Sequence, residues 1–389
     1  MQKNIGGDSL KILVVGQTSS FWIQEYVVRA LDPSVDEVYL LYDSHYGEGI
    51  KQEYEKKNVH LICTDRGVPI LGRIPKIRTA INLFYHMSKL SKDKKFDVIE
   101  FQGMPTGKIM FFFEKAILKF TESVVCMYWG SDLLATPEER VRYAEGTLKK
   151  ANYIVFDSNN LRDKFHEVFG NTYDHKIADT RLGTTIFEDL NAVLEKKTKA
   201  ECKEYFGLSK NSKIVAIGYN GRKRQQHIEV LKELTQIKKE KMKDVTLLLH
   251  LGYGLESVEY RMEIENYLKD NFDNYKIIDQ FLDKEQTAML RYAVDIFIHA
   301  QPSDALAGSI KEYLYAGAIL INPIWIDYSE CKALGVKYWE YETWNELPNL
   351  LEKMLEVDSE EVQKNRDLLY KHFSWDAVKP EWDKIHGKM

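Results

Sequence analysis

Three adjacent cations follow two glycines in the segment IGYNGRKRQQH, and this combination of residues could bind phosphate. Gly218 and Gly221 would let the backbone approach an anion closely, because glycine has no side chain to obstruct it. Arg222, Lys223 and Arg224 would neutralise its charge, and a helix expected directly afterwards would add the unpaired N–H groups of its first turn. The segment matches neither the GxxxxGKS/T nor the GxGxxG pattern, so a solvated basic turn is the alternative.

Two carboxylates, Asp304 and Glu312, are separated by seven residues in a second segment that leads from a predicted strand into a predicted helix. Gly308 and Ser309 stand where that helix should begin, and the amides of its first turn, up to Ile310, could receive a phosphate. Ser309 with Glu312 also fits the capping-box pattern, in which the two side chains only cap the helix. The residues alone leave both interpretations open.

The N-terminal half carries two further candidate segments, each directly after a predicted strand. The segment CMYWGSDL would place Trp129 and Asp132 at the end of its strand, and a helix cap is the alternative role of Asp132. The segment GQTSSF offers Gly16, Gln17 and Thr18, which could admit a sugar or phosphate, while the serines beside them could merely cap a helix. Ligands of parallel sheets bind at the carboxyl ends of strands, which is where both segments are predicted to lie.

Short apolar runs alternate with amphipathic stretches along the chain, the pattern of parallel sheets that helices cover on both faces. Strands are predicted at 10–16, 37–42, 59–63, 97–101, 123–129 and 153–157, and in a second series at 213–218, 245–251, 276–279, 296–300 and 318–322. The sequence therefore predicts an α/β chain of two Rossmann-like, doubly wound domains, 1–195 and 196–370, that face each other across a cleft. A helical segment at 371–389 follows them.

The composition limits the class of partner and the compartment. The 389 residues carry a formal charge of -5, with 44% hydrophobic and 29% charged residues, which fits a globular chain with no overall attraction to nucleic acid. The four cysteines lie far apart, so neither a disulfide scaffold nor a cysteine metal site is expected. The N-terminus lacks a signal-peptide pattern and no apolar window reaches the length of a membrane span, so a cytoplasmic location is expected.

The order of these segments resembles that of the GT-B glycosyltransferases, and of glycosyltransferase family 4 most closely. Asp304-x7-Glu312 stands at the position of that family's E-x7-E motif, and the stretch 315–323 resembles the turn that follows it. The tail FSWDAV resembles the aromatic C-terminal helix that crosses back to the first domain. Three departures stand out: Asp304 replaces a Glu, Trp129 replaces the family's His, and a cluster of cations replaces the usual R…K pair. The stretch GYNG…HI also resembles transferases that add acetamidofucose to lipid-linked intermediates, a second family that would invert the sugar's configuration.

The resemblance implies transfer of a hexosyl group from a nucleotide diphosphate sugar to an acceptor hydroxyl, in bacterial polysaccharide, glycolipid or glycoprotein glycan assembly. It implies a retaining reaction and no cofactor or metal, and the sequence shows neither a D-x-D triplet nor a His-rich cluster. The residues expected to be catalytic are Asp304, Glu312, Arg222 and Asp132. Those expected to bind the donor are Gly16, Gln17, Gly218, Tyr219, Gly221, Arg222, Lys223, Arg224, Gly308, Ser309, Ile310 and Glu312. Those expected to contact the sugar or acceptor are Thr18, Trp129, Asp132 and Asp304.

Two alternatives of other classes stay open, a sugar-nucleotide 2-epimerase and a non-catalytic nucleotide-sugar-binding partner of another transferase. A contact with the inner face of the membrane is a further expectation. The stretch 73–95 mixes apolar residues with Lys and Arg, and together with Phe111–Phe113 it could dock on anionic lipid to reach a lipid-linked acceptor. The alternative is an ordinary helix that packs on the core and exposes a basic face.

Overall fold

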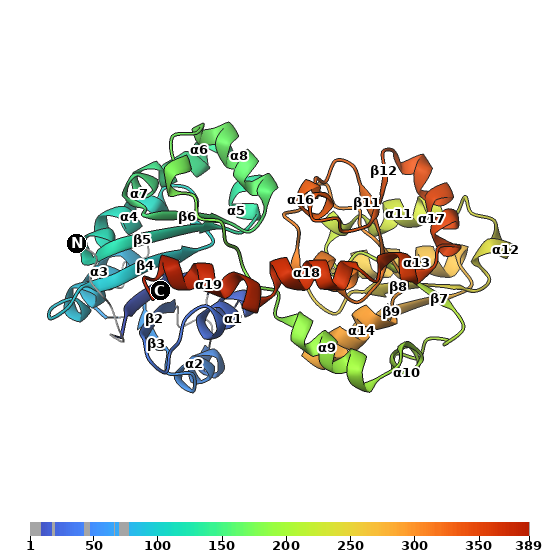
Figure 1. Ribbon diagram of the computed structural model, residues 1–389, viewed down its shortest axis with the longest axis horizontal. Coiled ribbons are helices and arrows are strands. Elements are labelled where there is room, and N and C mark those ends of the chain that lie inside the picture. The colour runs from blue at the N-terminus through green and yellow to red at the C-terminus, as the bar shows by residue number, and fades with distance from the viewer. Residues whose placement is uncertain (1–8, 18–19, 43–46, 66, 70–77, 389) are drawn as a thin grey trace. The chain divides into compact units, whose positions relative to one another are not determined.

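The chain forms two compact α/β units in a computed structural model, which describes residues 9–17, 20–42, 47–65, 67–69 and 78–388. Unit 1 comprises Met1–Gly183 and Trp375–Met389, and unit 2 comprises Thr184–Ser374 (Figure 1). Each unit contains a six-stranded sheet in which every pair of neighbouring strands is parallel. The predicted α/β class with two doubly wound halves is confirmed.

The strands of unit 1 lie in the order β3-β2-β1-β4-β5-β6. Their bounds are β1 Lys11–Val15, β2 Glu37–Tyr42, β3 His60–Cys63, β4 Phe96–Gln102, β5 Thr121–Tyr128 and β6 Tyr153–Phe156. The principal helices are α1 Phe21–Arg29, α2 Gly47–Glu55, α3 Arg78–Leu90, α4 Ile109–Ala116, α5 Ser131–Leu134, α6 Glu138–Val141, α7 Glu145–Lys150 and α8 Asn159–Phe169. All five residues of β1 are buried, because helices cover both faces of a parallel sheet. The order reverses between β1 and β4, and such a switch point opens a crevice at the carboxyl ends of the strands.

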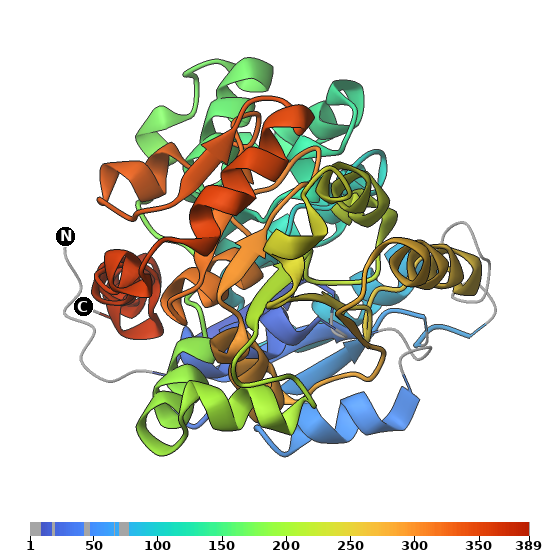
Figure 2. The ribbon, with the colours of Figure 1, turned by 90° about the vertical axis from the view of Figure 1, so that its right-hand side faces the viewer.

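Unit 2 repeats this topology in the order β9-β8-β7-β10-β11-β12. Its strands are β7 Lys213–Ile217, β8 Val245–His250, β9 Tyr275–Ile278, β10 Ile296–Ile298, β11 Ile319–Pro323 and β12 Trp339–Tyr341. Its principal helices are α9 Ile186–Lys196, α10 Lys199–Tyr205, α11 His227–Leu234, α12 Lys239–Met242, α13 Val258–Asn271, α14 Lys284–Ala293, α15 Gly308–Tyr315, α16 Ser329–Ala333, α17 Leu347–Leu355 and α18 Asn365–Phe373. In the turned view of Figure 2, these helices, coloured from green to red, surround the strands of the unit. The switch point lies between β7 and β10.

The side chains of β7 alternate between two separate cores, as the pleat of a strand requires. Ile214 and Ala216 belong to one hydrophobic cluster, and Val215 and Ile217 belong to the other. Both faces of the sheet are therefore apolar, and polar side chains are left for the ends of the strands. No helix within the described ranges combines the length and the apolar character needed to cross a membrane.

The units end at places other than the predicted domain boundaries of 195 and 370. Helix α9, expected in the first domain, packs in unit 2, where the ring of Phe187 stacks on that of Tyr315 with centroids 4.0 Å apart. Helix α18 extends unit 2 to Ser374, and the Thr184 N–H donates to the carbonyl of Phe373. Packing between distant residues sets both boundaries, which local sequence patterns do not reveal.

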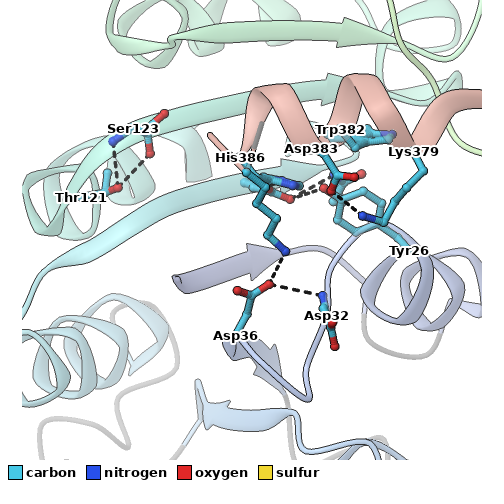
Figure 3. A network of polar contacts seen from close by, with 12 residues as sticks. Tyr26, Asp32, Asp36, Thr121, Ser123, Lys379, Trp382, Asp383 and His386 are labelled. Atoms are coloured by element: carbon cyan, nitrogen blue, oxygen red, sulfur yellow. Dashed lines mark hydrogen bonds and ion pairs between the residues drawn. The ribbon is translucent and has the colours of Figure 1, made fainter. Parts of the chain in front are cut away.

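The C-terminal helix α19, Trp375–Ile385, belongs to unit 1 and contains Pro380. Trp382 is fully buried among the residues of the unit 1 core, and its indole N–H donates to the carbonyl of Arg181 at 2.9 Å. Figure 3 shows His386 and Trp382 on the same side of this helix, next to Tyr26 of α1. Apolar packing therefore fastens the last residues of the chain to its first half.

A buried carboxylate, Glu100 on β4, lies at the centre of the polar contacts around α19. The Tyr26 hydroxyl donates to one of its oxygens at 2.5 Å, and His386 hydrogen-bonds to the other. Lys388 forms an ion pair with Asp36 nearby. Glu100 has no exposed surface, so these partners compensate a charge that would otherwise be unfavourable in the core.

Candidate functional site

A tight loop at the carboxyl end of β7 holds the cations singled out in the sequence. Gly218 has φ +63°, a conformation that favours glycine. A Cβ at Gly221 would lie 2.8 Å from the Cα of Leu255, so the loop passes directly against that neighbouring segment. Inside the loop, the Tyr219 N–H donates to the side chain of Gln225 at 3.2 Å. Helix α11 begins only at His227, so the three cations lie on the turn before the helix and not within its first turn.

The three cations of this loop have different surroundings. Arg224 donates through Nη2 to the carbonyl and hydroxyl of Ser303, at 2.7 and 3.1 Å, and so ties the loop to the segment after β10. The Lys223 ammonium lies 5.4 Å from the centre of the Tyr260 ring. Arg222 is exposed, and no acidic side chain in the described part of the chain pairs with it. Arg222 is thus the cation whose guanidinium is left for a ligand.

Asp304 organises the loop between β10 and α15. Its Oδ2 accepts hydrogen bonds from the Ala307 N–H at 2.8 Å and from the Tyr328 hydroxyl at 2.7 Å. The Gln301 amide lies 3.4 Å from Oδ1 and also donates to the hydroxyl of Tyr219 at 2.8 Å. These contacts bring Asp304 and the loop after β7 to the same edge of the sheet.

Helix α15 begins at Gly308, and the capping box suggested for Ser309 and Glu312 is wrong. Ala307 occupies the N-cap position without a side-chain hydrogen bond. The Ile310 N–H donates to the Ala307 carbonyl at 2.9 Å, so it is not open to a ligand. The N–H groups of Gly308 and Ser309 have no acceptor among the described residues, as is usual at the start of a helix. These two amides are therefore unused donors at the start of α15, the kind of position where helices can receive an anion.

The side chains expected to cap α15 point instead to Arg291 of α14, which the sequence-based reasoning missed. Arg291 donates to Glu312 Oε2 at 2.9 Å and to Ser309 Oγ at 3.3 Å. Burial by itself would lower the pKa of Arg291, but the neighbouring Tyr313 and Glu312 hold it above its usual value. The available signal was an arginine inside the apolar run AMLRYAV of a predicted helix, which suggests a buried partner.

Two neutral groups at the carboxyl end of β8 complete this side of the site. Burial, with Arg291 nearby, lowers the pKa of His250 to about 4, so the imidazole is neutral at physiological pH. Burial raises the pKa of Tyr253, and a hydrogen bond to Ser309 acts in the opposite direction. Neither His250 nor Tyr253 therefore adds a charge to this edge of unit 2 at physiological pH.

The described candidate residues of unit 1 lie at the carboxyl ends of β1 and β5. A Cβ at Gly16 would lie 2.5 Å from the Ile23 side chain and 3.0 Å from the Gln102 carbonyl, so a larger residue there would require Ile23 to move. Gln17 is exposed, and Thr18 lies outside the described residues. Ser20 is at the N-cap of α1, but its side chain makes no capping hydrogen bond.

Asp132 stabilises the turn after β5. Its carboxylate accepts from three backbone N–H groups, those of Trp129 at 3.1 Å, Gly130 at 2.7 Å and Met104 at 2.9 Å. Burial raises the pKa of Asp132, and these backbone hydrogen bonds oppose that effect. The indole of Trp129 packs over Gly103, and its N–H lies 3.4 Å from the Gln102 side chain. Asp132 therefore holds the turn before α5 but does not cap that helix, whose N-cap is Gly130, so the helix-cap alternative is wrong. Trp129 is a large side chain at this edge.

Comparison with known proteins finds similarity in structure only. No protein-family model and no curated protein matches the chain. HepE from Anabaena, solved in complex with UDP and glucose, superposes with a TM-score of 0.70 at 14% identity, over 98% of this chain and 100% of that one. A glycosyltransferase from Rickettsia africae gives a TM-score of 0.75 at 14% identity, over 97% and 98%. The UDP-GlcNAc 2-epimerase of Neisseria meningitidis gives 0.62 at 14% identity, over 98% and 100%.

Likeness at this level of identity establishes the fold. The neighbours align over nearly their whole length, and both sheets have the doubly wound strand order. Among the described residues, no three His, Cys, Asp or Glu side chains are grouped as metal ligands. The chain has the GT-B fold, with two Rossmann-like units and candidate residues at the carboxyl edge of each sheet.

Proposed function

We propose that this protein is a glycosyltransferase that moves a hexosyl group from a nucleotide diphosphate sugar to an acceptor hydroxyl. The observation that carries the proposal is the edge of unit 2, where exposed Arg222 and the open amides of Gly308 and Ser309 flank the switch point between β7 and β10. Positive charge and helix N–H groups together bind diphosphate well. The structural neighbours include HepE, which was solved with UDP and glucose.

The same edge suggests how the reaction proceeds. The leaving group is a nucleoside diphosphate, so the main task is to stabilise the charge that develops on it, which preorganised donors do effectively. Arg222 and the amides of Gly308 and Ser309 would serve this role without a metal. Glu312 would accept from the ribose hydroxyls. Asp304, held by Tyr328, would contact the sugar and shield positive charge on its anomeric carbon, and we propose retention of configuration there.

Thermal unfolding with a panel of nucleotide sugars tests the proposal. A ligand present at about 100 times its dissociation constant adds about 2.7 kcal/mol of stability to a protein that binds it. The stabilising sugar nucleotide is then incubated with saccharide, glycolipid and glycoprotein acceptors, and release of the nucleoside diphosphate is measured. Glu312→Ala should reduce the response, whereas Lys232→Ala, a change at an exposed lysine of α11, should not. A panel in which no nucleotide sugar stabilises the protein would refute the proposal.

The products distinguish the proposal from its alternatives. A sugar-nucleotide 2-epimerase would convert the donor to its epimer without an acceptor, and the epimerase among the structural neighbours keeps this second activity open. A non-catalytic partner would bind the donor and release no nucleoside diphosphate. For a transferase, the NMR coupling of the product's anomeric proton reports the configuration, and an inverted product would reject the retaining assignment and favour the acetamidofucose-type alternative.

We also propose that unit 1 contacts the inner face of the membrane through α4. Phe111 and Phe112 expose 53% and 41% of their surface, although they belong to an apolar helix, whereas Phe113 packs in the core. Lys108 is exposed at the start of the helix, and Lys119, just after it, lies 4.3 Å from the centre of an exposed phenylalanine ring of α3. Aromatic side chains flanked by lysines suit the surface of an anionic bilayer.

Vesicle cosedimentation tests this contact. Wild-type protein should sediment with phosphatidylglycerol vesicles at low salt and less with phosphatidylcholine, because lysine attraction to anionic lipid adds to aromatic burial. The double change Phe111→Ser and Phe112→Ser should reduce sedimentation, while Tyr205→Ser, a control at an exposed aromatic of α10, should not. Wild-type protein that stays in solution with anionic vesicles would exclude the contact.

A further inference from the structure

Arg291 of α14 is a buried cation that takes no part in the diphosphate contacts proposed above. Only 2% of its surface is exposed, yet each nitrogen of its guanidinium donates to a side chain of α15. Nε donates to Glu312 Oε2 at 2.9 Å, Nη1 to the Tyr313 hydroxyl at 2.8 Å and Nη2 to Ser309 Oγ at 3.3 Å. The guanidinium carbon lies 4.3 Å from the centre of the Tyr313 ring. These contacts therefore fix both the position of the Arg291 guanidinium and the orientation of its plane relative to α15.

Stability alone gives a weak reason for this arrangement. Moving two charges out of water is costly, and a buried ion pair often stabilises a protein no more than apolar side chains of the same volume would. Helices α14 and α15 already share an apolar core that includes Met289, Leu290, Ile310 and Leu314. What an apolar residue cannot do in place of Arg291 is orient a carboxylate. Nε of the guanidinium holds Oε2 of the Glu312 carboxylate and the positive charge balances it, while the other two nitrogens anchor the guanidinium to Tyr313 and Ser309.

The carboxylate of Glu312 is engaged on one side only. Arg291 occupies Oε2, and no described residue donates a hydrogen bond to Oε1. The Glu312 side chain is 10% exposed and lies one turn along α15 from the open amides of Gly308 and Ser309. A carboxylate with one oxygen held and the other open is a directed acceptor, and a ligand with hydroxyl groups is its natural partner.

We infer that Arg291 is a positioning residue that aims Glu312 Oε1 at the ribose hydroxyls of the nucleotide without touching the nucleotide itself. This inference rests on the proposed function. It predicts that Arg291 controls how strongly the site prefers a ribonucleotide over the analogue without these hydroxyls. A residue that only joined two helices would change the stability of the protein and leave this preference intact.

The test compares the affinity of a nucleoside diphosphate with that of its 2′,3′-dideoxy analogue by calorimetry. Uridine, guanosine and adenosine diphosphates are screened on the wild type, and the one that binds is used. A hydrogen bond to a charged group corresponds to a preference of about 10- to 100-fold for the ribonucleotide in the wild type. Arg291→Met keeps an apolar stem of similar volume. It should reduce the preference for the ribonucleotide to less than about threefold, because the hydrogen bond between the ribose and Glu312 no longer forms. The ratio of the two affinities does not depend on the fraction of protein that is folded.

Two further variants separate positioning from structure. In a Glu312→Gln background, Arg291→Met should have no additional effect on the preference, because residues that act through one contact are non-additive. Arg366→Met is the matched control, since Arg366 donates to the Tyr315 carbonyl at the other end of α15. It should leave the preference unchanged. Arg291→Lys, which keeps the charge without the fork, serves if Arg291→Met does not fold, and it too should lose most of the preference.

Each outcome bears on a separate claim. The inference would be overturned if both Arg291 variants kept the wild-type preference. It would also be overturned if Arg291→Met lowered the preference as much in the Glu312→Gln background as it does in the wild type. A wild type that binds no nucleoside diphosphate would refute the proposed function instead. A wild type that binds both nucleotides equally would show that Glu312 does not read the ribose, and the inference would fall while diphosphate binding stood.

Discussion

The three cations after β7 should differ in their effect on donor binding, and the structure predicts their order. Arg222 is exposed and has no acidic partner within the described residues, Arg224 is tied to Ser303, and Lys223 lies over the Tyr260 ring. Arg222→Ala should therefore weaken donor binding and leave the stability of the fold unchanged. Arg224→Ala should lower both quantities, because it also releases the loop from the segment after β10.

The magnitudes follow from exposure. A hydrogen bond to a charged group contributes about 1.5–3 kcal/mol, and solvent around an exposed Arg222 reduces this to about 1–2 kcal/mol, or about 5- to 30-fold in affinity. Loss of the two hydrogen bonds from Arg224 to Ser303 should cost about 1–2 kcal/mol of stability. Lys223→Ala removes only an exposed cation–π contact and should change affinity by less than about threefold.

Calorimetry with the nucleoside diphosphate, paired with urea unfolding of each variant, measures both quantities. The effect of Arg222→Ala should shrink at high salt, because exposed charges are screened. A larger loss for Lys223→Ala than for Arg222→Ala would refute the assignment of the diphosphate to Arg222. An Arg222→Ala variant that lost stability in proportion to affinity would show that the arginine supports the loop and not the ligand.

Three further predictions concern the supports of the site. Gly218→Ala should cost more stability in urea unfolding, and more donor affinity in calorimetry, than Gly170→Ala. Both glycines have φ near +60°, but only Gly218 of the two has side-chain atoms within 3.0 Å of an added Cβ. Equal losses would show that this crowding is irrelevant. His386→Ala should destabilise unit 1 by about 3–5 kcal/mol in urea unfolding, since it removes a partner of buried Glu100; a loss below about 1 kcal/mol would contradict the role of this network. Asp132→Asn should lower stability by about 1–3 kcal/mol through its backbone contacts, whereas lost turnover at unchanged stability would mark a chemical role.

The sheets were predictable because their signal is local. Most strands are continuous runs of β-branched and other apolar residues, such as KIVAI at β7, because helices cover both faces of the sheet and bury the side chains on each. Strand β12 escaped prediction because it has only three residues and carries Glu340 at its centre. The glycine loop after β7 and the start of α15 at Gly308 were predicted within a residue or two, since glycine and helix-start patterns are also local.

Tertiary contacts account for what the sequence did not reveal. Ser309 and Glu312 fit the local pattern of a capping box. However, Arg291, 21 positions before Glu312, donates hydrogen bonds to both side chains instead. Likewise, the first domain was expected to include α9 until the stacking of Phe187 on Tyr315 assigned that helix to unit 2. A pattern shows what a segment can do alone, and competition from a distant partner becomes visible only in the folded chain.

The proposed function requires that unit 2 bind the diphosphate of a sugar nucleotide at the carboxyl edge of its sheet. A crystal structure of the protein with the nucleoside diphosphate that stabilises it tests this most directly. We predict phosphate oxygens within hydrogen-bonding distance of the Gly308 and Ser309 N–H groups and of the Arg222 guanidinium, with the ribose at Glu312. A diphosphate bound away from the first turn of α15 and from the loop after β7 would contradict it.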